Sequence, residues 1–386
     1  MPWQRADAVT AYLTAAEAAA RLGVTRQTLY AYVSRGLIEA HPTEDPRVRA
    51  YAAEAVARLA ETRHRGRRPR EVARAALDWG LPVLETAVTL IRDGRLFYRG
   101  ADAVALAGTA TLEEVAARLW DLPLDAAFGP DAPEGAPRGG DLIGAFAAAT
   151  ADDPTAPWQT DPARLAAGCG ALVRLLGACV TGGAPSAAPL HRQCAAAWGL
   201  DAAGAQAVRR ALVLCADHEL NASGFTARCV ASAGASLRAA VIGGLAALSG
   251  TRHGGATARV EALWDALDAA DPAASLRRQL AGRDGLPGFG HPLYPAGDPR
   301  AAALLAPLVA DDPRLRAVVA AAEELTGARP ALDVALVALR RHLGLPRGSA
   351  FGLFALGRSA GWIAQGLEQR QGGLIRPRAV YVGLEP

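Results

Sequence analysis

The chain has 386 residues, of which 51% are hydrophobic and 20% are charged. This length and composition provide enough apolar material for a large buried core and a small additional domain, which excludes extensive disorder. The formal net charge is only +3, but all 41 basic residues are arginines, whose planar guanidinium groups suit carboxylates and phosphates.

The apolar pattern indicates neither a membrane span nor a leader peptide. No stretch reaches about 18 uninterrupted apolar residues, and residues 1–14 lack the charged and then apolar order of a signal peptide. We therefore expect a soluble, cytoplasmic protein. The cysteines are odd in number and lack CxxC spacing, which indicates reduced core residues without a metal site or a disulfide framework. They are Cys169, Cys179, Cys194, Cys215 and Cys229.

The first predicted element is a helix, a tight turn and a second helix over residues 14–38 (TAAEAAARLGVTRQTLYAYVSRGLI). Alanines and Leu22 recur at helical spacing in the first helix, Gly23 supplies the turn, and Thr25 is placed to cap the second helix. This stretch, with a wing-like segment at 47–59, resembles the helix-turn-helix of excisionases and mercury-resistance regulators.

The start of the second helix is where a recognition helix meets base edges and phosphates. The candidate DNA-binding residues there, just after this helix and in the wing are Arg26, Gln27, Thr28, Tyr30, Arg35, Arg47 and Arg49. An arginine-rich run at 63–74 fits either a solvated linker or a phosphate-contacting segment. We place a domain boundary near residue 75, so that residues 1–74 form a DNA-binding-like domain with a basic linker.

From residue 75 onward, alanine and leucine recur at the i, i+3 and i+4 positions of amphipathic helices. The clearest predicted helices lie at 110–122, 164–180, 202–220 and 236–249, and a loop rich in proline and glycine lies at 128–141. Strand signals are scarce, the best being LFYRG at 96–100 and AVYVG at 379–383. We therefore predict an all-α domain after residue 75.

Three histidines lie in polar or glycine-rich segments that have no helical period. They are His218 in ADHELNAS, His253 in RHGGAT and His291 in PGFGHPLYPAGDPRA. A single such histidine is more often structural than catalytic. Three of them together, with Arg300 in DPR and Asp333 in ALDVAL, indicate a catalytic site.

The segments that carry these residues resemble the citrate synthase family. DHELNAS, HGGA, GFGHPLYPAGDPRA, ALD, GRSAGWIAQGLEQ and IRPRAVYVG occur in the family's order and with its spacing, and YRGADAVALAGTATLEEVAARLW at 98–120 is similar to an early family segment. The resemblance covers residues from about 80 to 386. It implies a large and a small helical domain that close over a cleft, preceded here by the winged helix-turn-helix.

The implied boundaries place the whole synthase-like domain at 75–386. The large subdomain would comprise about 75–215 and 335–386, and the small subdomain about 216–334. The family implies a homodimer and condensation of acetyl-CoA with oxaloacetate in the tricarboxylic acid cycle. That reaction is an acyl transfer that turns the acyl group into an alkyl group, with acetyl-CoA as co-substrate and no permanently bound cofactor.

The resemblance also implies roles for individual residues. Asp333 would remove the methyl proton of acetyl-CoA, His253 would hydrogen-bond the thioester oxygen, and His291 would polarise the ketone of oxaloacetate. Gly254 and Gly255 would allow a close approach of backbone and cofactor, and the helix start after them would favour a neutral His253. The oxaloacetate ligands would be His218, Arg300, Arg358 and, from the neighbouring subunit, Arg376.

Several positions depart from the family pattern. Pro292 stands where an arginine usually follows the histidine, which would weaken CoA binding or change the acceptor pocket. Ala331 and Leu332 replace the usual Asn-Val, and Thr257 replaces a common asparagine. Besides citrate synthase, three alternatives stay open: a propionyl-CoA-dependent 2-methylcitrate synthase, a transcription regulator that senses oxaloacetate or acyl-CoA, and an assembly role for the small domain.

Overall fold

The computed structural model divides into two compact units, Met1–Glu85 with Pro377–Pro386 and Thr86–Arg376, and each is considered by itself. The described residues are 12–34, 37–43, 45, 49–57, 59, 84–137, 139–150, 152–268, 271–282, 285–379 and 383. The predicted boundary near residue 75 and the arginine-rich run at 63–74 lie outside them, as do Arg35 and Arg47.

The N-terminal unit combines two helices with a small antiparallel sheet. Its elements are β1 (Tyr12–Thr14), α1 (Ala15–Leu22), α2 (Arg26–Ser34), β2 (His41–Pro42) and β3 (Arg49–Ala52). The strand order is β1-β3-β2, with Leu13 opposite Tyr51 and His41 opposite Ala50. Buried side chains from both helices and the sheet, among them Leu22, Leu29 and Tyr51, form a core of its own.

Local signals in the sequence explain the helix-turn-helix. Thr14 and Glu17 form a reciprocal capping box at the start of α1, and Gly23 ends that helix with a left-handed φ of 61°. The backbone N–H of Thr28 donates to Thr25 Oγ1 at 3.2 Å, which caps α2 as predicted. The predicted winged helix-turn-helix is therefore confirmed.

The second unit begins with a small sheet and continues almost entirely as helices. The sheet has the order β4-β5-β6, from β4 (Thr89–Arg92), β5 (Arg95–Tyr98) and β6 (Ala101–Asp102). The helices of its first half are α5 (Ala103–Thr109), α6 (Leu112–Trp120), α7 (Leu124–Ala127), α8 (Leu142–Ala148), α9 (Pro162–Thr181), α10 (Leu190–Trp198) and α11 (Ala202–Cys215).

The helices of the second half carry most of the predicted site residues on their ends or in the loops between them. They are α12 (Ala222–Ser232), α13 (Leu237–Leu248), α14 (Ala256–Ala266), α15 (Pro272–Leu280), α16 (Pro299–Asp311), α17 (Pro313–Thr326), α18 (Leu332–His342) and α19 (Ser349–Arg370). The helical fold predicted from the sequence is confirmed.

Helix α19 is the centre of this unit. It packs against α6, α9, α11, α12, α13 and α18, and almost all of its side chains are buried. Trp120 of α6 donates its indole N–H to the carbonyl of Ala360 at 2.8 Å. A side chain at Gly361 would overlap the segment that follows α11, so glycine here allows α19 to approach that segment closely.

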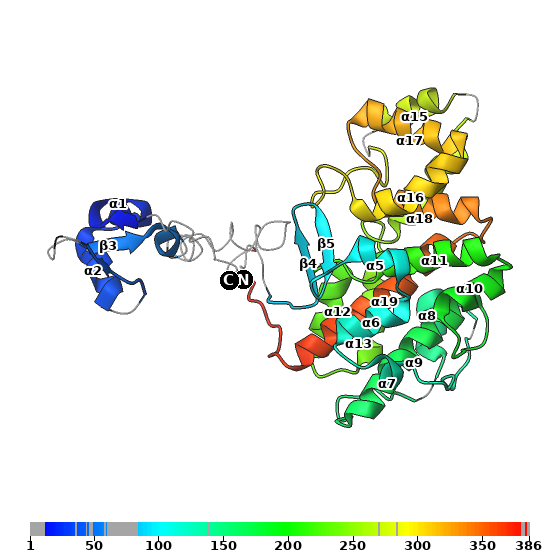
Figure 1. The fold of residues 1–386 in the computed structure, drawn as a ribbon, viewed down its shortest axis with the longest axis horizontal. Helices are drawn as coiled ribbons and strands as arrows, with labels where there is room; N and C mark the ends of the chain where they lie inside the picture. Colours follow the sequence, from blue (N-terminus) through cyan, green and yellow to red (C-terminus); the bar gives the residue numbers. More distant parts are fainter. Residues whose placement is uncertain are drawn as a thin grey trace, which may run out of the picture. The chain divides into compact units, whose positions relative to one another are not determined.

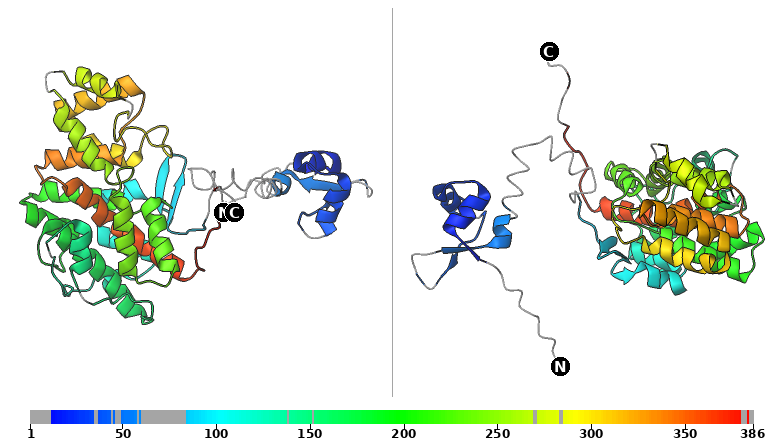
Figure 2. Two further views of the ribbon diagram at one scale, coloured as in Figure 1. Left: turned by 180° about the vertical axis from the view of Figure 1, so that it is seen from behind. Right: turned by 90° about the horizontal axis from the view of Figure 1, so that it is seen from above.

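The remaining helices extend from this centre in two directions. In Figure 1, α15 and α17 lie together at the top of the unit and α7 and α9 lie at the bottom, and Figure 2 shows the same arrangement from behind. We expected residues 216–334 to form the small subdomain. Instead, α12 and α13 from that range pack against α19 within the larger helical body.

One predicted helix ends earlier than its pattern indicates. The helix expected over 202–220 stops at Cys215, because the next residues turn away and Glu219 adopts a left-handed φ of 51°. The predicted strand at 379–383 falls largely on residues that are not described. The strand predicted at 96–100 is confirmed over residues 96–98, which lie in β5, while residues 99 and 100 form a turn after it.

Among the described residues, α9 alone is long and apolar enough to cross a membrane. It spans 20 residues, and 61% of its most apolar window is buried inside the structure. Its neighbours are α7, α8, α10 and α19. The apolar character of α9 therefore matches its place in the core.

Candidate active site

The segment between α11 and α12 places His218 in the interior. The Tyr98 hydroxyl of β5 donates to the carbonyl of Val213 at 3.1 Å, and Thr89 of β4 donates to Asp217 Oδ2 at 2.6 Å. Gln365 of α19 also contacts Asp217 Oδ2, at 3.3 Å. The sheet and α19 thus fix the segment that carries His218.

Two aromatic side chains, those of His291 and Tyr294, lie next to His218. Its ring centroid lies 5.2 Å from that of His291 and 5.6 Å from that of Tyr294, and the Tyr294 hydroxyl lies 3.0 Å from His218 Nε2. Burial lowers the pKa of His218 well below its usual value, and Arg300 and Arg358 lower it further. His218 is therefore a neutral imidazole.

A tight turn brings His291 and Tyr294 together. The Tyr294 N–H donates to the carbonyl of His291 at 2.9 Å, so Pro292 occupies the second position of a β-turn, where proline is favoured. The Leu293 N–H donates to His291 Nδ1 at 3.2 Å. Burial, together with Arg300, lowers the pKa of His291 to about 4, so the ring is neutral. Because Nδ1 accepts the Leu293 N–H, the ring carries its one proton on Nε2.

Asp298 joins the loop to two helices. Its carboxylate accepts from Arg300 Nε at 2.9 Å and Nη2 at 2.7 Å, and it caps α16 through the backbone N–H of Arg300 at 3.0 Å. It also accepts the N–H of Leu332, the first residue of α18, at 3.2 Å. Burial alone would raise the pKa of Asp298, but the Arg300 guanidinium outweighs burial and keeps that pKa low.

Asp333 lies in the first turn of α18. Its Oδ1 atom is buried and has no hydrogen-bond partner within the described part of the chain. Burial raises its pKa to about 6, against the opposing influence of Arg300 and Arg358. A carboxylate with this environment is a strong candidate for a general base that works near neutral pH.

His253 sits in a turn between α13 and α14. Its Nε2 lies 2.8 Å from Ser223 Oγ and 3.2 Å from Asn221 Oδ1, both at the start of α12, and these oxygens orient the ring. Burial lowers its pKa to about 3, with Arg358 and Arg300 adding to the effect. The sequence predicted a neutral His253 from its position at a helix start. In the structure, burial and the two arginines account for the neutral ring.

Close packing explains why two glycines follow His253. A side chain at Gly255 would overlap the carbonyl oxygens of Ser249 and Gly250, and one at Gly254 would overlap Leu248. The turn therefore lies directly on the C-terminal end of α13. The two glycines therefore allow the backbone of this turn to pack closely against the end of α13.

Arg358 lies near the middle of α19 and is only 1% exposed. Its Nε donates to the carbonyl of Cys215 at 2.8 Å, while its buried Nη1 has no partner among the described residues. Burial lowers its pKa, and Asp217 opposes this effect. A buried guanidinium with an N–H that lacks a partner is suited to donate a hydrogen bond to an anion.

The structure thus brings most of the predicted site residues into one buried polar cluster, through mutual electrostatic and ring contacts. They are His218, His253, His291, Arg300, Asp333 and Arg358. Arg376 is exposed on the segment after α19. Among the described residues, no contact ties Arg376 to this cluster within the single chain.

Sequence reasoning did not single out several residues that shape the cluster. They are Tyr294, Asp298, Ser223, Asn221 and Asp217. All lie inside the motifs that carried the histidines and Arg300. Asp298 had a readable signal, since an aspartate directly before a proline is typical of a helix N-cap.

In the N-terminal unit, the predicted DNA-binding residues that are described lie toward solvent. Arg26, Gln27 and Arg49 are exposed, Tyr30 is 52% exposed, and Thr28 is half-buried. They belong to the start of α2 and to β3. The exposed members of this set include two guanidinium groups, an amide and an aromatic ring.

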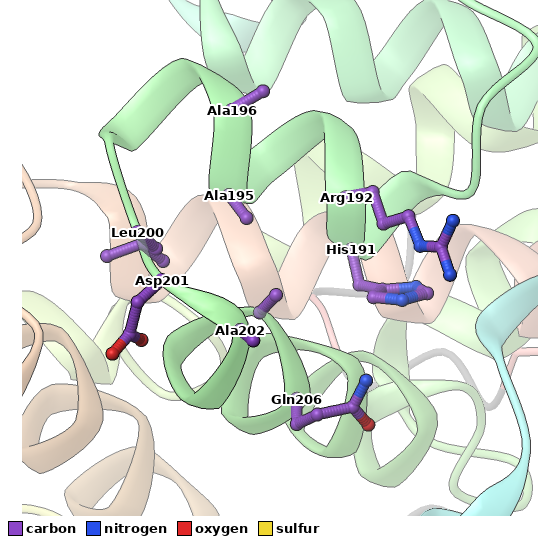
Figure 3. A pocket seen from close by; sticks show the side chains of 9 residues that line it. His191, Arg192, Ala195, Ala196, Leu200, Asp201, Ala202 and Gln206 are labelled. Atoms are coloured by element: carbon purple, nitrogen blue, oxygen red, sulfur yellow. The ribbon is translucent and has the colours of Figure 1, made fainter.

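A hollow of about 400 Å³ lies between α10 and α11 (Figure 3). Its polar lining includes His191, Arg192, Asp201 and Gln206. None of the residues in the buried polar cluster lines it. The hollow is therefore a separate feature from the candidate active site.

The second unit is helical and gathers three histidines, two buried arginines and Asp333, whose Oδ1 has no partner among the described residues, in one polar cluster. Residues 139–378 match the family model "Citrate synthase, C-terminal domain", and the chain therefore belongs to the citrate synthase family. Residues 12–64 match a helix-turn-helix domain.

Curated relatives and solved structures agree with this membership. The chain is 37% identical over 185 residues to the citrate synthase of Haloferax volcanii, covering 45% of this chain and 49% of that protein. It is 37% identical over 186 residues to the 2-methylcitrate synthase of Shewanella oneidensis, covering 45% and 50%. The chain thus spans about half the length of the curated relatives it matches.

The structural likeness is more extensive. Citrate synthase from Thermoplasma acidophilum, in a ternary complex with carboxymethyl coenzyme A and oxaloacetate, superposes with a TM-score of 0.64 at 25% identity. That match covers 79% of this chain and 95% of that one. Citrate synthase from Thermotoga maritima gives a TM-score of 0.63 at 25% identity, covering 79% and 94%.

Proposed function

We propose that this protein condenses acetyl-CoA with oxaloacetate and water to form citrate and CoA. The observation that carries the proposal is the buried carboxylate of Asp333, whose Oδ1 has no partner in the part of the chain that the structure describes and whose pKa is raised to about 6. An unpaired carboxylate is costly to bury, so its presence beside two buried arginines favours a catalytic role.

The first step is enol formation from acetyl-CoA. Asp333 accepts a proton from the methyl carbon, and His253 hydrogen-bonds the thioester oxygen on which charge develops. The Ser223 hydroxyl lies 2.8 Å from His253 Nε2. The Ser223 hydroxyl donates to Asn221 Oδ1 at 2.7 Å, so His253 Nε2 carries the ring proton in this arrangement. For Nδ1–H to reach the thioester oxygen, the Ser223 hydroxyl turns to donate to Nε2 and the ring changes tautomer.

The second step forms the carbon–carbon bond. The enol carbon attacks the ketone carbon of oxaloacetate, and His291 Nε2–H polarises the ketone oxygen, which becomes the hydroxyl of citryl-CoA. His218, Arg300 and Arg358 hold the carboxylates of oxaloacetate. Water then cleaves the thioester, releasing CoA as the thiol and leaving citrate.

The proposal includes a homodimer in which Arg376 of the partner subunit completes the oxaloacetate site. Its support is the exposed position of Arg376 in the single chain, outside the buried cluster. The matched control for Arg376→Ala is Arg378→Ala, because Arg378 is exposed two residues further along the same segment. Loss of oxaloacetate affinity in the first variant alone supports the shared site, and equal affinity in both counts against it.

The acyl group is the open choice within this reaction. Acetyl and propionyl groups differ by one methylene, which is worth only about 1–3 kcal/mol in a pocket. Mass spectrometry of products formed from an equimolar mixture of acetyl-CoA and propionyl-CoA tests the choice directly. An excess of citrate supports acetyl-CoA, and an excess of the methylated product favours a 2-methylcitrate synthase.

A second candidate function is a regulator that binds DNA and senses oxaloacetate or acyl-CoA. The observation that favours it is the solvent-facing set on the N-terminal unit, with Arg26 and Gln27 at the start of α2 and Arg49 in β3. The N-terminal end of a recognition helix is the part that contacts base edges and phosphates. A symmetric dimer would present two such helices to a pseudo-palindromic site.

Charge removal tests this second function. The double variant Arg26→Ala/Arg49→Ala should bind random duplex DNA more weakly than the wild type. Its affinity should also depend less steeply on salt concentration, by the amount expected for the loss of about two phosphate contacts. The control Arg118→Ala/Arg164→Ala removes two exposed arginines from the other unit. If both variants and the wild type bind DNA equally, the N-terminal unit has another role, such as assembly.

A further inference from the structure

We propose that Tyr294 is a positioning residue that fixes the tautomer of His218, so that Nδ1 of His218 presents its proton to a carboxylate of oxaloacetate. The inference rests on the proposed function, because it assigns how one substrate ligand is kept in its binding form. Tyr294 acts through His218 and does not itself contact the reacting atoms.

The geometry places Tyr294 among the proposed oxaloacetate ligands. Its hydroxyl lies 3.0 Å from His218 Nε2, and its side chain is only 2% exposed. Its ring centroid is 5.0 Å from that of His291, and the Arg300 guanidinium carbon lies 5.6 Å from the same centroid. One aromatic ring therefore packs against three groups that would surround the substrate.

The positions of the protons determine which atom donates in the hydrogen bond between Tyr294 and His218. Burial raises the pKa of Tyr294 to about 12, so its hydroxyl keeps its proton. Within the described residues, that hydroxyl has His218 Nε2 as its hydrogen-bond partner. If Nε2 carried the imidazole proton, the buried Tyr294 O–H would have no acceptor. Donation from Tyr294 to Nε2 satisfies both groups and leaves the imidazole proton on Nδ1.

A carboxylate can only accept hydrogen bonds, so the tautomer controls affinity. With Nδ1 protonated, His218 offers oxaloacetate a donor; with Nε2 protonated, it presents a lone pair to an anion. The charged and titratable groups around this pair come from several elements. They are Arg300 from α16, Arg358 from α19, His253 and His291 from the loops, and Asp217, Glu219 and Asp298 nearby.

The test is Tyr294→Phe, which removes the hydroxyl and keeps the ring contacts. Oxaloacetate binding is measured by titration calorimetry from pH 6 to pH 8, in pairs of buffers with different ionisation enthalpies. At pH 8 we expect the dissociation constant to rise about 10- to 100-fold, as for loss of a hydrogen bond to a charged group.

The pH dependence separates a positioning role from a merely structural one. Without the Tyr294 donor, the neutral ring can hold its proton on either nitrogen, and a second proton that is taken up with the anion protonates both nitrogens and so secures Nδ1–H. The variant should therefore take up about one more proton per oxaloacetate than the wild type, and its affinity deficit should shrink toward pH 6.

Tyr98→Phe is the matched control. Tyr98 is also a buried tyrosine, but its hydroxyl donates to the carbonyl of Val213 at 3.1 Å and contacts no histidine nitrogen. It should lose stability without extra proton uptake. Equal affinity of Tyr294→Phe and wild type, or a deficit that is the same at every pH, overturns the inference. A wild-type protein that binds no oxaloacetate contradicts the proposed function instead.

Discussion

Asp298 holds the guanidinium of Arg300 through two parallel hydrogen bonds, 2.9 Å at Nε and 2.7 Å at Nη2, and both side chains are almost fully buried. The same carboxylate caps α16 and accepts the first N–H of α18. One buried ion pair therefore sets the position of a proposed substrate ligand and of the helix that carries Asp333.

The first prediction concerns this pair. Asp298→Asn keeps an N-cap oxygen but removes the charge opposite Arg300, so we expect the free energy of unfolding to fall by about 3–5 kcal/mol. Asp102→Asn is a close control, because Asp102 also caps a helix and pairs with Arg95, whose side chain is 62% exposed. Its effect should stay within about 1 kcal/mol in urea denaturation. Equal losses in the two variants would contradict a special role for the buried pair.

The second prediction concerns the cost of keeping Asp333 charged. Burial raises its pKa from 3.8 to about 6, so the folded state binds more protons than the unfolded state between these values. The charged carboxylate therefore reduces stability as pH rises from about 4 to 6, and the reduction persists above pH 6. Asp333→Asn should be more stable than the wild type at pH 7.5, by an amount on the order of 3 kcal/mol.

The same variant should lose turnover. Removal of a general base costs about 100- to 10,000-fold in rate, so Asp333→Asn should combine a higher melting temperature with near-absent condensation. Thermal unfolding at pH 7.5 and pH 4 provides the internal control, because the stability difference should vanish at the lower pH. An active Asp333→Asn enzyme would remove this residue from the mechanism.

The third prediction is the pH profile of kcat/KM. Asp333 must be deprotonated to act as a base, so kcat/KM should rise with pH through an apparent pKa near 6 and then level off. His253 and His291, with pKa values lowered to about 3 and about 4, should stay neutral throughout. A decline between pH 6 and pH 8, or a profile flat down to pH 5, would count against this assignment.

The fourth prediction concerns Pro292. Its turn position matches the fixed φ of proline, and the turn is closed by the Tyr294 N–H to His291 carbonyl bond. Pro292→Ala should lower the free energy of unfolding by about 0.4–1 kcal/mol through the unfolded chain, and leave kcat within about twofold. A large loss of kcat would show that the ring of Pro292 does more than restrict the turn.

Local signals in the sequence were enough to predict several parts of the structure. Gly23 and Thr25 fixed the helix-turn-helix, because a left-handed turn and an N-cap depend on neighbouring residues only. The ordered motifs around His218, His253 and His291 indicated one site, and the structure gathers these side chains.

Long-range contacts explain what the sequence could not predict. The helix over 202–220 ends at Cys215 because Asp217 turns inward to meet Thr89, which is 128 residues away. The hydroxyl of Tyr294 reaches His218 across 76 residues, and no local pattern encodes that pairing. The sequence also did not predict that α12 and α13 pack against α19, because α19 lies far from them along the chain.

Oxaloacetate-dependent release of CoA thiol is the most direct test of the central claim. The purified full-length protein is given acetyl-CoA with and without oxaloacetate, and free thiol is followed over time alongside the His253→Ala variant. We expect thiol release only when oxaloacetate is present, and we expect this release to be lost in the variant. A folded protein that releases no thiol, or releases it equally without oxaloacetate, would contradict the proposed condensation.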